Sequence, residues 1–134
     1  MSEPLTLLVV DDSKVSRIMS TGYLRKHRPA LRVLEASHAD EACALIERER
    51  PDWLLLDHNM PGRSGLDLAE QLRAERPTLR IALLTANVQD ATQARAQALG
   101  VHFFRKPITE NVVLEVLRTL EAAGPLSANH EAHA

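Results

Sequence analysis

Residues 54–65 read LLLDHNMPGRSG, and this stretch decides the fold class. Its three leucines form a continuous apolar run, which is typical of a strand buried on both faces of a parallel sheet. The run ends at Asp57, and Pro61-Gly62 is a turn signal shortly after it. Open α/β sheets bind their ligands beyond the carboxyl ends of parallel strands. We therefore predict that Asp57 is a site residue, although this motif alone indicates a helix-capping role equally well.

The overall composition is that of an ordinary single-domain protein. The chain has 134 residues, 25% of them charged and 45% hydrophobic, and its formal net charge is −2. This charge gives no indication of a nucleic-acid or membrane surface, and no apolar run is long enough to span a bilayer. The N-terminus has no signal-peptide character, and the single cysteine, Cys43, has no partner within one chain. We therefore expect a cytoplasmic protein in which Cys43 is a small, buried, apolar side chain.

Strand and helix patterns alternate along the chain. The strand patterns cover residues 5–10, 31–34, 52–57, 79–84 and 101–104. The helix patterns run from the N-cap Ser13 to Arg28-Pro29 and over residues 38–49, 64–75, about 88–99 and about 109–122, with Gly100 as a natural helix-ending residue. Five strands alternating with five helices at crossover spacings predict an α/β fold, a three-layer doubly wound (βα)5 sandwich with a parallel sheet of order 2-1-3-4-5.

Two segments carry further structural expectations. The first helix should turn the apolar side chains of Val15, Ile18, Met19 and Leu24 towards the core. Residues 123–134 are small and polar. We therefore expect one domain over residues 1–122, followed by a short polar C-terminal tail.

Polar residues follow four of the five predicted strands at their carboxyl ends: Asp11 and Asp12, Asp57, Thr85, and Lys106. The switch point of the predicted sheet would bring these ends together. Three carboxylates in one pocket repel one another unless a cation is bound, and a site without Cys or His suits Mg²⁺ better than zinc. Asp11 and Asp12 could instead merely begin a helix. Because Asp11 and Asp12 lie at the same predicted edge of the sheet as Asp57 and Lys106, we favour metal binding.

The remaining members of this group fit phosphoryl transfer onto Asp57. Lys106 supplies a compact positive charge, and Thr85 supplies a rotatable hydroxyl donor. The small side chain of Ala86 leaves the backbone N–H of its turn open to a ligand oxygen. A metal and Lys106 would neutralise the equatorial phosphoryl oxygens while Asp57 attacks in line.

Four motifs together resemble a known family. VVDDS (9–13), LLLDHNMPG (54–62), LLTA (83–86) and FFRKP (103–107) resemble, in order and spacing, the receiver domain of two-component response regulators, which has the chemotaxis-regulator (CheY-like) fold. The resemblance covers residues 5 to about 122. It implies a protein that accepts a phosphoryl group from a sensor histidine kinase, a hybrid kinase or a phosphotransfer protein. Because the predicted tail is too short for an output module, we expect a single-domain regulator that acts through protein contacts, or as a phosphate relay or sink.

The resemblance also implies roles for individual residues. Asp57 would be the phosphoacceptor, and Thr85 and Lys106 would contact the phosphoryl group together with the backbone of Ala86. The Lys106–Pro107 peptide bond would be cis. The implied ligands of Mg²⁺ are Asp11, Asp12, Asp57 and the backbone carbonyl of Asn59.

Two residues depart from the family's usual pattern. Phe103 stands at the position of the switch aromatic but lacks the hydroxyl of the tyrosine often found there, so any switch would work by ring burial. Ile108 replaces an aromatic that commonly follows the Lys-Pro pair, which should affect only packing. Phe104 faces away from Phe103 in an extended strand, and we expect it in the core.

The last predicted helix should turn Val113, Val116, Leu117 and Leu120 inwards. Val112, Leu114 and Val116 place apolar side chains around more of this helix than that one buried stripe requires. Scattered exposed apolar residues are common. The resemblance, however, implies an output surface on helix 88–99, strand 101–104 and helix 109–122. We therefore favour a docking patch for a downstream protein there, and a phosphorylation-linked homodimer through the last helix stays open.

Other classes of function fit only parts of this pattern. An aspartyl-phosphate phosphohydrolase of the haloacid dehalogenase type needs a second carboxylate two residues after its nucleophile, where Asn59 cannot protonate a leaving group. A purely structural interaction domain would not need five polar site residues gathered at the carboxyl ends of its strands. His58 could be a metal ligand, but the residue after Asp57 should point away from the site. We predict a signalling phosphoacceptor rather than an enzyme, which catalyses only its own Mg²⁺-dependent phosphorylation and dephosphorylation.

Overall fold

The structure, a computed structural model, describes residues 5–86 and 89–122. Five strands and five helices alternate within these residues, as the sequence predicts. The strands are β1 (Thr6–Val10), β2 (Arg32–Ala36), β3 (Trp53–Asp57), β4 (Arg80–Thr85) and β5 (His102–Arg105). The helices are α1 (Lys14–His27), α2 (Ala39–Glu49), α3 (Gly65–Glu75), α4 (Asp90–Ala98) and α5 (Glu110–Ala122).

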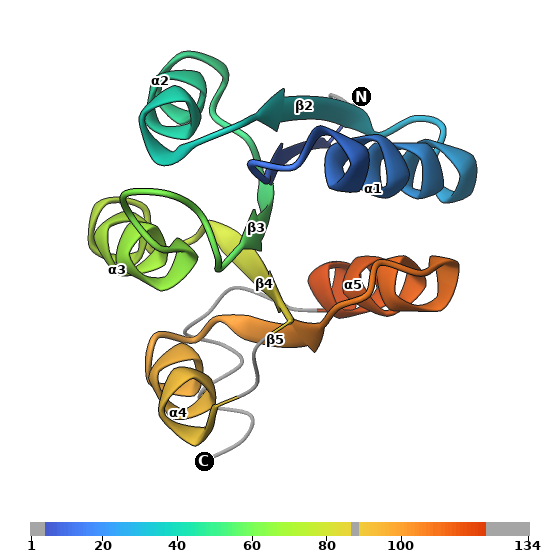
Figure 1. The fold of residues 1–134 in the computed structure, drawn as a ribbon. Coiled ribbons are helices and arrows are strands. Elements are labelled where there is room, and N and C mark those ends of the chain that lie inside the picture. The colour runs from blue at the N-terminus through green and yellow to red at the C-terminus, as the bar shows by residue number, and fades with distance from the viewer. Residues whose placement is uncertain (1–4, 87–88, 123–134) are drawn as a thin grey trace.

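The strands form one parallel sheet of order β2-β1-β3-β4-β5, which confirms the predicted topology. Helices α1 and α5 cover one face of the sheet, and α2, α3 and α4 cover the other, so the domain has three layers (Figure 1). None of the helices in residues 5–86 and 89–122 has the length and apolar character needed to cross a membrane.

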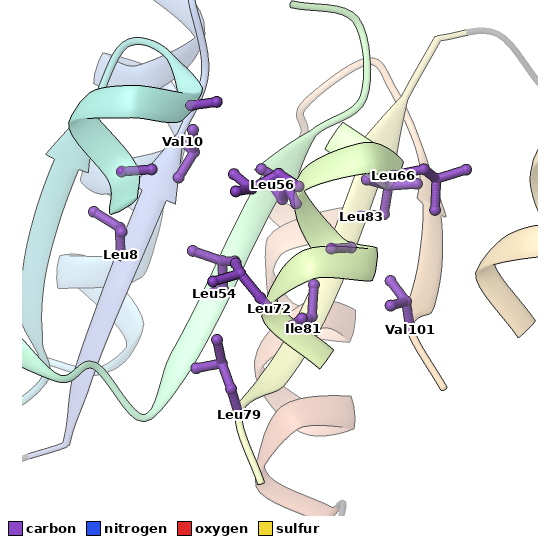
Figure 2. Close-up of a cluster of buried hydrophobic side chains, with 14 of the residues drawn as sticks. Leu8, Val10, Leu54, Leu56, Leu66, Leu72, Leu79, Ile81, Leu83 and Val101 are labelled. Carbon is purple, nitrogen blue, oxygen red and sulfur yellow. The ribbon is translucent and has the colours of Figure 1, made fainter. Parts of the chain in front are cut away.

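A separate apolar core lies on each face of the sheet. The α3-side core contains Leu54 and Leu56 together with side chains of α2 and α3 (Figure 2). The α5-side core contains Leu55, whose side chain points the opposite way, as the two-residue period of a strand requires. Each fully buried leucine stabilises the fold by roughly 1.5–3 kcal/mol relative to exposure. The central strand is thereby fixed from both sides, and Asp57 is its last residue.

Local capping signals set the helix ends near the site. The Ser13 side chain accepts a hydrogen bond from the backbone N–H of Ser16 at 3.2 Å, which confirms Ser13 as the N-cap of α1. Ser64 caps α3 in the same way through the N–H of Asp67 at 3.1 Å. Gly100 has a φ of 69° just after α4, a conformation that glycine adopts without a steric penalty.

The expected inner face of α1 is wrong. Val15, Ile18 and Met19 are 67%, 58% and 40% exposed, and only Leu24 of the expected set lies in the core. The helix instead turns Ser20, Thr21 and Leu24 inwards. The stripe that begins with Val15 and Ile18 continues along the helix into Gly22, Arg25 and Lys26, so it has no apolar second half to bury.

Candidate functional site

The carboxyl ends of the strands bring the predicted polar residues together at one edge of the sheet. Asp11 follows β1 directly, and Asp57 ends β3. Carboxylate oxygens of Asp11, Asp12 and Asp57 all lie within 4.8 Å of one another. Lys106 Nζ lies 3.3 Å from Asp57 Oδ1 and 3.5 Å from Asp11 Oδ2. One lysine therefore compensates part of the negative charge of three clustered carboxylates.

The loop after β5 aims Lys106 at this cluster. The backbone N–H of Lys106 donates to the carbonyl of Thr85 at 2.9 Å, which continues the β4–β5 pairing beyond the strand. The Lys106–Pro107 peptide bond is cis, as expected. Ile108 follows in the α5-side core, so its role is in packing, as predicted.

The environment of Asp57 makes its negative charge unfavourable. Asp57 and Asp11 are each 3% exposed, whereas Asp12 is exposed. Burial and the neighbouring charge of Asp11 raise the pKa of Asp57 to about 6, although Lys106 and the N–H of Asn59 act in the opposite direction. Asp57 is therefore ionised at neutral pH but held in a destabilised state, which a bound cation would relieve.

Helix α3 begins against the end of β3. A Cβ atom at Gly65 would lie 2.5 Å from the carbonyl oxygen of Asp57 and 2.8 Å from the Cα of His58. Only a residue without a side chain fits at this distance. The backbone N–H of Gly65 donates to the carbonyl of His58 at 2.9 Å. This close packing fixes the backbone that carries the Asp57 side chain.

Asn59 links Asp57 to Thr85. Its backbone N–H donates to Asp57 Oδ1 at 3.3 Å, and its side-chain amide donates to Thr85 Oγ1 at 3.5 Å. Thr85 is fully buried, while Ala86 beside it is exposed. The family resemblance implied only a backbone role for Asn59 in cation binding, and nothing in the sequence pattern indicated that its side chain reaches the threonine on the neighbouring strand.

Comparisons with known proteins agree on one family. The model of the response regulator receiver domain matches residues 7–118. The chain belongs to this family. Among its relatives, the probable transcriptional regulatory protein TcrX of Mycobacterium tuberculosis is 37% identical over 126 residues, which is 91% of this chain and 52% of TcrX. Protein PilH of Pseudomonas aeruginosa is 29% identical over 87% of this chain and 97% of its own length.

Solved receiver structures have the same fold. The chemotaxis protein CheY4 of Vibrio cholerae matches with a TM-score of 0.79 at 25% identity, over 87% of this chain and 98% of CheY4. A putative response regulator from Chloroflexus aurantiacus matches with a TM-score of 0.79 at 28% identity, over 90% of this chain and 99% of that one. The receiver is a two-component signalling domain, which agrees with the predicted family and fold. The chain spans only about half the length of TcrX, so the activity of that whole protein does not transfer to it.

The acidic cluster of this receiver fits a divalent cation. Receiver domains bind Mg²⁺ at an acidic cluster, and here three carboxylates offer oxygen ligands close together. No histidine or cysteine within the described residues belongs to this group. His58 lies outside it, in agreement with the prediction that the side chain after Asp57 points away. Its Nδ1 atom is buried without a hydrogen-bond partner in the described part of the chain, and burial lowers the pKa of the ring.

The two phenylalanines of β5 face opposite sides of the sheet, as predicted. Phe103 packs against the α3-side core and Phe104 against the α5-side core, and both are half-buried. The expected apolar patch on α5 is smaller than predicted. Val116 is fully buried in the α5-side core, and only Val112 and Leu114 are partly exposed. Val116 lies on the same face of α5 as Val113 and Leu120, which confirms its predicted inward position and removes it from the patch.

Sequence reasoning also missed Arg17. Its guanidinium donates to the backbone carbonyl of Asp11 and pairs with Glu35 at the end of β2. Arg17 lies on the inward stripe of α1 together with Ser20, Thr21 and Leu24, and that spacing was the available signal. Cys43 is half-buried against the α3-side core and is a free cysteine, close to its predicted role.

Proposed function

We propose that this receiver accepts a phosphoryl group on Asp57 and transmits the change through phosphorylation-dependent protein binding. One observation carries the proposal: the buried carboxylate of Asp57 lies 3.3 Å from the ammonium of Lys106 and beside two further aspartates. A strand-end carboxylate needs no such surroundings to cap a helix. The receiver unit would run to the end of α5 at Ala122, and we infer that it works in the cytoplasm, where its free Cys43 stays reduced.

The transfer step uses groups that the site already holds. An Asp57 oxygen attacks the phosphorus atom of a phosphohistidine, the new P–O bond forms as the P–N bond breaks, and the electron pair stays on the leaving nitrogen. Lys106 holds negative charge on the phosphoryl oxygens. The Thr85 hydroxyl and the Ala86 backbone N–H contact the same oxygens.

A divalent cation completes the charge balance. The residues that would hold Mg²⁺ are Asp11, Asp12 and Asp57, with the backbone carbonyl of Asn59 as a further ligand. When bound, Mg²⁺ supplies positive charge against both the carboxylates and the incoming phosphoryl oxygens. A phosphohydrolase would also need an acid for the leaving group two residues after Asp57. Asn59 cannot supply that proton, which favours a stoichiometric acceptor.

Small-molecule phosphodonors test the proposal directly. Acetyl phosphate with Mg²⁺ should add a single phosphoryl group, detected by intact mass and mapped to Asp57 by peptide analysis. Asp57→Asn should abolish the addition, whereas Asp40→Asn, which changes an exposed carboxylate of α2, should not. Equal labelling of Asp57→Asn and the parent, or labelling that EDTA leaves unchanged, would contradict the mechanism.

The exposed face of α1 is the surface we assign to the phosphodonor. Val15, Ile18 and Met19 are spaced as neighbours on one helix face and begin three residues after Asp12. A protein donor that reaches buried Asp57 must cover this edge of the sheet, and α1 begins there, two residues after Asp12. Helix α1 carries no acidic residue, while Lys14, Arg25 and Lys26 are exposed on it. The complementary donor surface is an apolar helical face with carboxylates at its rim.

A double variant distinguishes the binding of a protein donor from the transfer of the phosphoryl group to Asp57. Ile18→Ser with Met19→Ser should slow transfer from a phosphorylated histidine kinase core or phosphotransfer domain at least tenfold. The same variant should keep its rate with acetyl phosphate, which needs no docking surface. Ala44→Ser, at an exposed position of α2 on the other face of the sheet, is the control and should keep the rate of the parent with both donors. An unchanged protein-donor rate in the double variant would remove α1 from the donor interface.

We assign the output to α4, β5 and α5, with Thr85 and Phe103 as the switch. A phosphoryl group brings nearly two negative charges and new acceptor oxygens to Asp57, and the Thr85 hydroxyl would move towards them. The Phe103 ring, which packs against the α3-side core, could then fill the vacated space without losing a hydrogen bond. A downstream protein, or a second copy of the receiver, would detect the change at Val112 and Leu114 on this face.

A further inference from the structure

Arg17 connects the acidic cluster to a neighbouring strand. Its Nη1 donates to the backbone carbonyl oxygen of Asp11 at 2.6 Å, and its Nε donates to Glu35 Oε1 at 3.3 Å. The Arg17 side chain is 17% exposed, against 42% for Glu35. A mostly buried guanidinium that donates to two partners has less rotational freedom than an exposed, unpaired arginine.

The carbonyl that Arg17 contacts belongs to the peptide group joining Asp11 to Asp12, two members of the acidic cluster. The other polar groups of Asp11 are already fixed. Its N–H donates to the carbonyl of Ala36 at 3.1 Å, and its Oδ1 accepts from the N–H of Ser13 at 2.9 Å. Rotation of the Asp11–Asp12 peptide would move one carboxylate relative to the other. The hydrogen bond from Arg17 restrains this rotation.

We propose that Arg17 is a positioning residue that holds the Asp11–Asp12 peptide in the orientation required for binding a divalent cation. The inference rests on the proposed cation site formed by these residues and Asp57. Arg17 does not contact the cation itself. It acts through the backbone, as the groups behind metal ligands commonly do when they orient those ligands.

Charge and orientation predict opposite effects of removing Arg17. A guanidinium hydrogen-bonded to the backbone carbonyl of Asp11 places positive charge near the cluster and repels an incoming cation, so loss of its charge alone should strengthen metal binding. Loss of the hydrogen bond to the Asp11 carbonyl should weaken binding, because the two carboxylates then have to be ordered when the metal binds. The sign of the change therefore distinguishes the proposed role from a simple electrostatic one.

The experiment measures binding of Mg²⁺ and Mn²⁺ to the full chain by calorimetry and by electron paramagnetic resonance of free Mn²⁺. Arg17→Gln should raise the dissociation constant about tenfold, at the low end of the loss seen when a group behind a metal ligand is removed. Arg17→Lys keeps the charge but cannot reach both partners, so it should also bind more weakly. Arg48→Gln, which removes an exposed arginine of α2 paired with Glu49, is the charge-matched control and should change nothing.

Two further readouts separate positioning from general damage. Amide NMR of the metal-free protein should place the spectral changes of Arg17→Gln at residues 11–13. At saturating Mg²⁺ the rate at which acetyl phosphate labels Arg17→Gln should approach that of the parent. The variant should therefore differ from the parent only in the Mg²⁺ concentration that it needs for labelling. Tighter or unchanged metal binding in Arg17→Gln, or unchanged binding in Arg17→Lys, would overturn the inference. Failure of the parent protein to bind Mg²⁺ would instead refute the proposed cation site itself.

Discussion

Removal of the Asp57 charge should stabilise the metal-free protein above pH 6. Burial and Asp11 raise the pKa of this carboxyl from its ordinary 3.8 to about 6. The folded state therefore holds a proton that the unfolded state has already released, and stability falls as pH rises through this interval. A shift of roughly two pKa units corresponds to about 3 kcal/mol of lost stability at pH 7.5. Asp57→Asn keeps the shape of the protonated side chain without its charge, and it should recover most of this lost stability.

Urea unfolding with and without Mg²⁺ measures this effect. Without metal, Asp57→Asn should exceed the parent by up to about 3 kcal/mol at pH 7.5, which corresponds to roughly 10 °C in Tm for a domain of this size. Near pH 4 the difference should shrink to roughly 0.5 kcal/mol, because the carboxyl is then protonated in the folded state and only about half ionised in the unfolded state. Saturating Mg²⁺ should narrow the difference at pH 7.5, since it stabilises the folded parent by mass action.

A matched variant controls for the loss of one negative charge. Glu115→Gln removes an exposed carboxylate of α5, and it should change stability by less than about 0.5 kcal/mol. If Asp57→Asn were no more stable than the parent at pH 7.5 without metal, the Asp57 charge would not be held in a destabilised state. The same conclusion would follow if the difference did not depend on pH between 4 and 7.5.

Three further changes test the site and its supports. Lys106→Met should destabilise the metal-free protein by about 1–3 kcal/mol at pH 7.5, and by less at pH 5, because it leaves ionised Asp57 uncompensated; equal losses at both pH values in urea titrations would contradict this. Gly65→Ala should destabilise the fold by about 2–3 kcal/mol through its clash with the end of β3. Gly22→Ala meets open space in α1 and should stabilise by about 0.5–1 kcal/mol in the same assay, so similar effects at the two glycines would argue against the clash. Phe103→Ala should leave acetyl phosphate labelling nearly intact but flatten the NMR response of α4, β5 and α5 to beryllofluoride, a coupling of about 1–3 kcal/mol. An unchanged response would rule out this ring as the switch.

The strand-end residues show how far the sequence alone determines this site. The apolar run before Asp57 and the run before Asp11 each predict a buried parallel strand, and both are observed. Parallel strands place their carboxyl ends at one edge of the sheet whatever the details of packing. The proximity of Asp11, Asp57 and Lys106 could therefore be predicted from their positions at the strand ends. In the structure, Lys106 lies within ion-pair distance of both aspartates.

What only the tertiary structure decided is how the helices are rotated on the sheet and which side chains cross between elements. Val15 and Ile18 follow a helical period but face outwards, whereas Val116, which the sequence pattern placed in both the inner face and the surface patch of α5, is buried. A helix rotates about its axis to the position where all its contacts with the sheet and its neighbours are most favourable, and no single stripe fixes that angle. The contacts of Arg17 with Asp11 and of Asn59 with Thr85 depend on the same rotation and on loop geometry. They join residues from different elements, and so they exist only once the sheet and helices have packed.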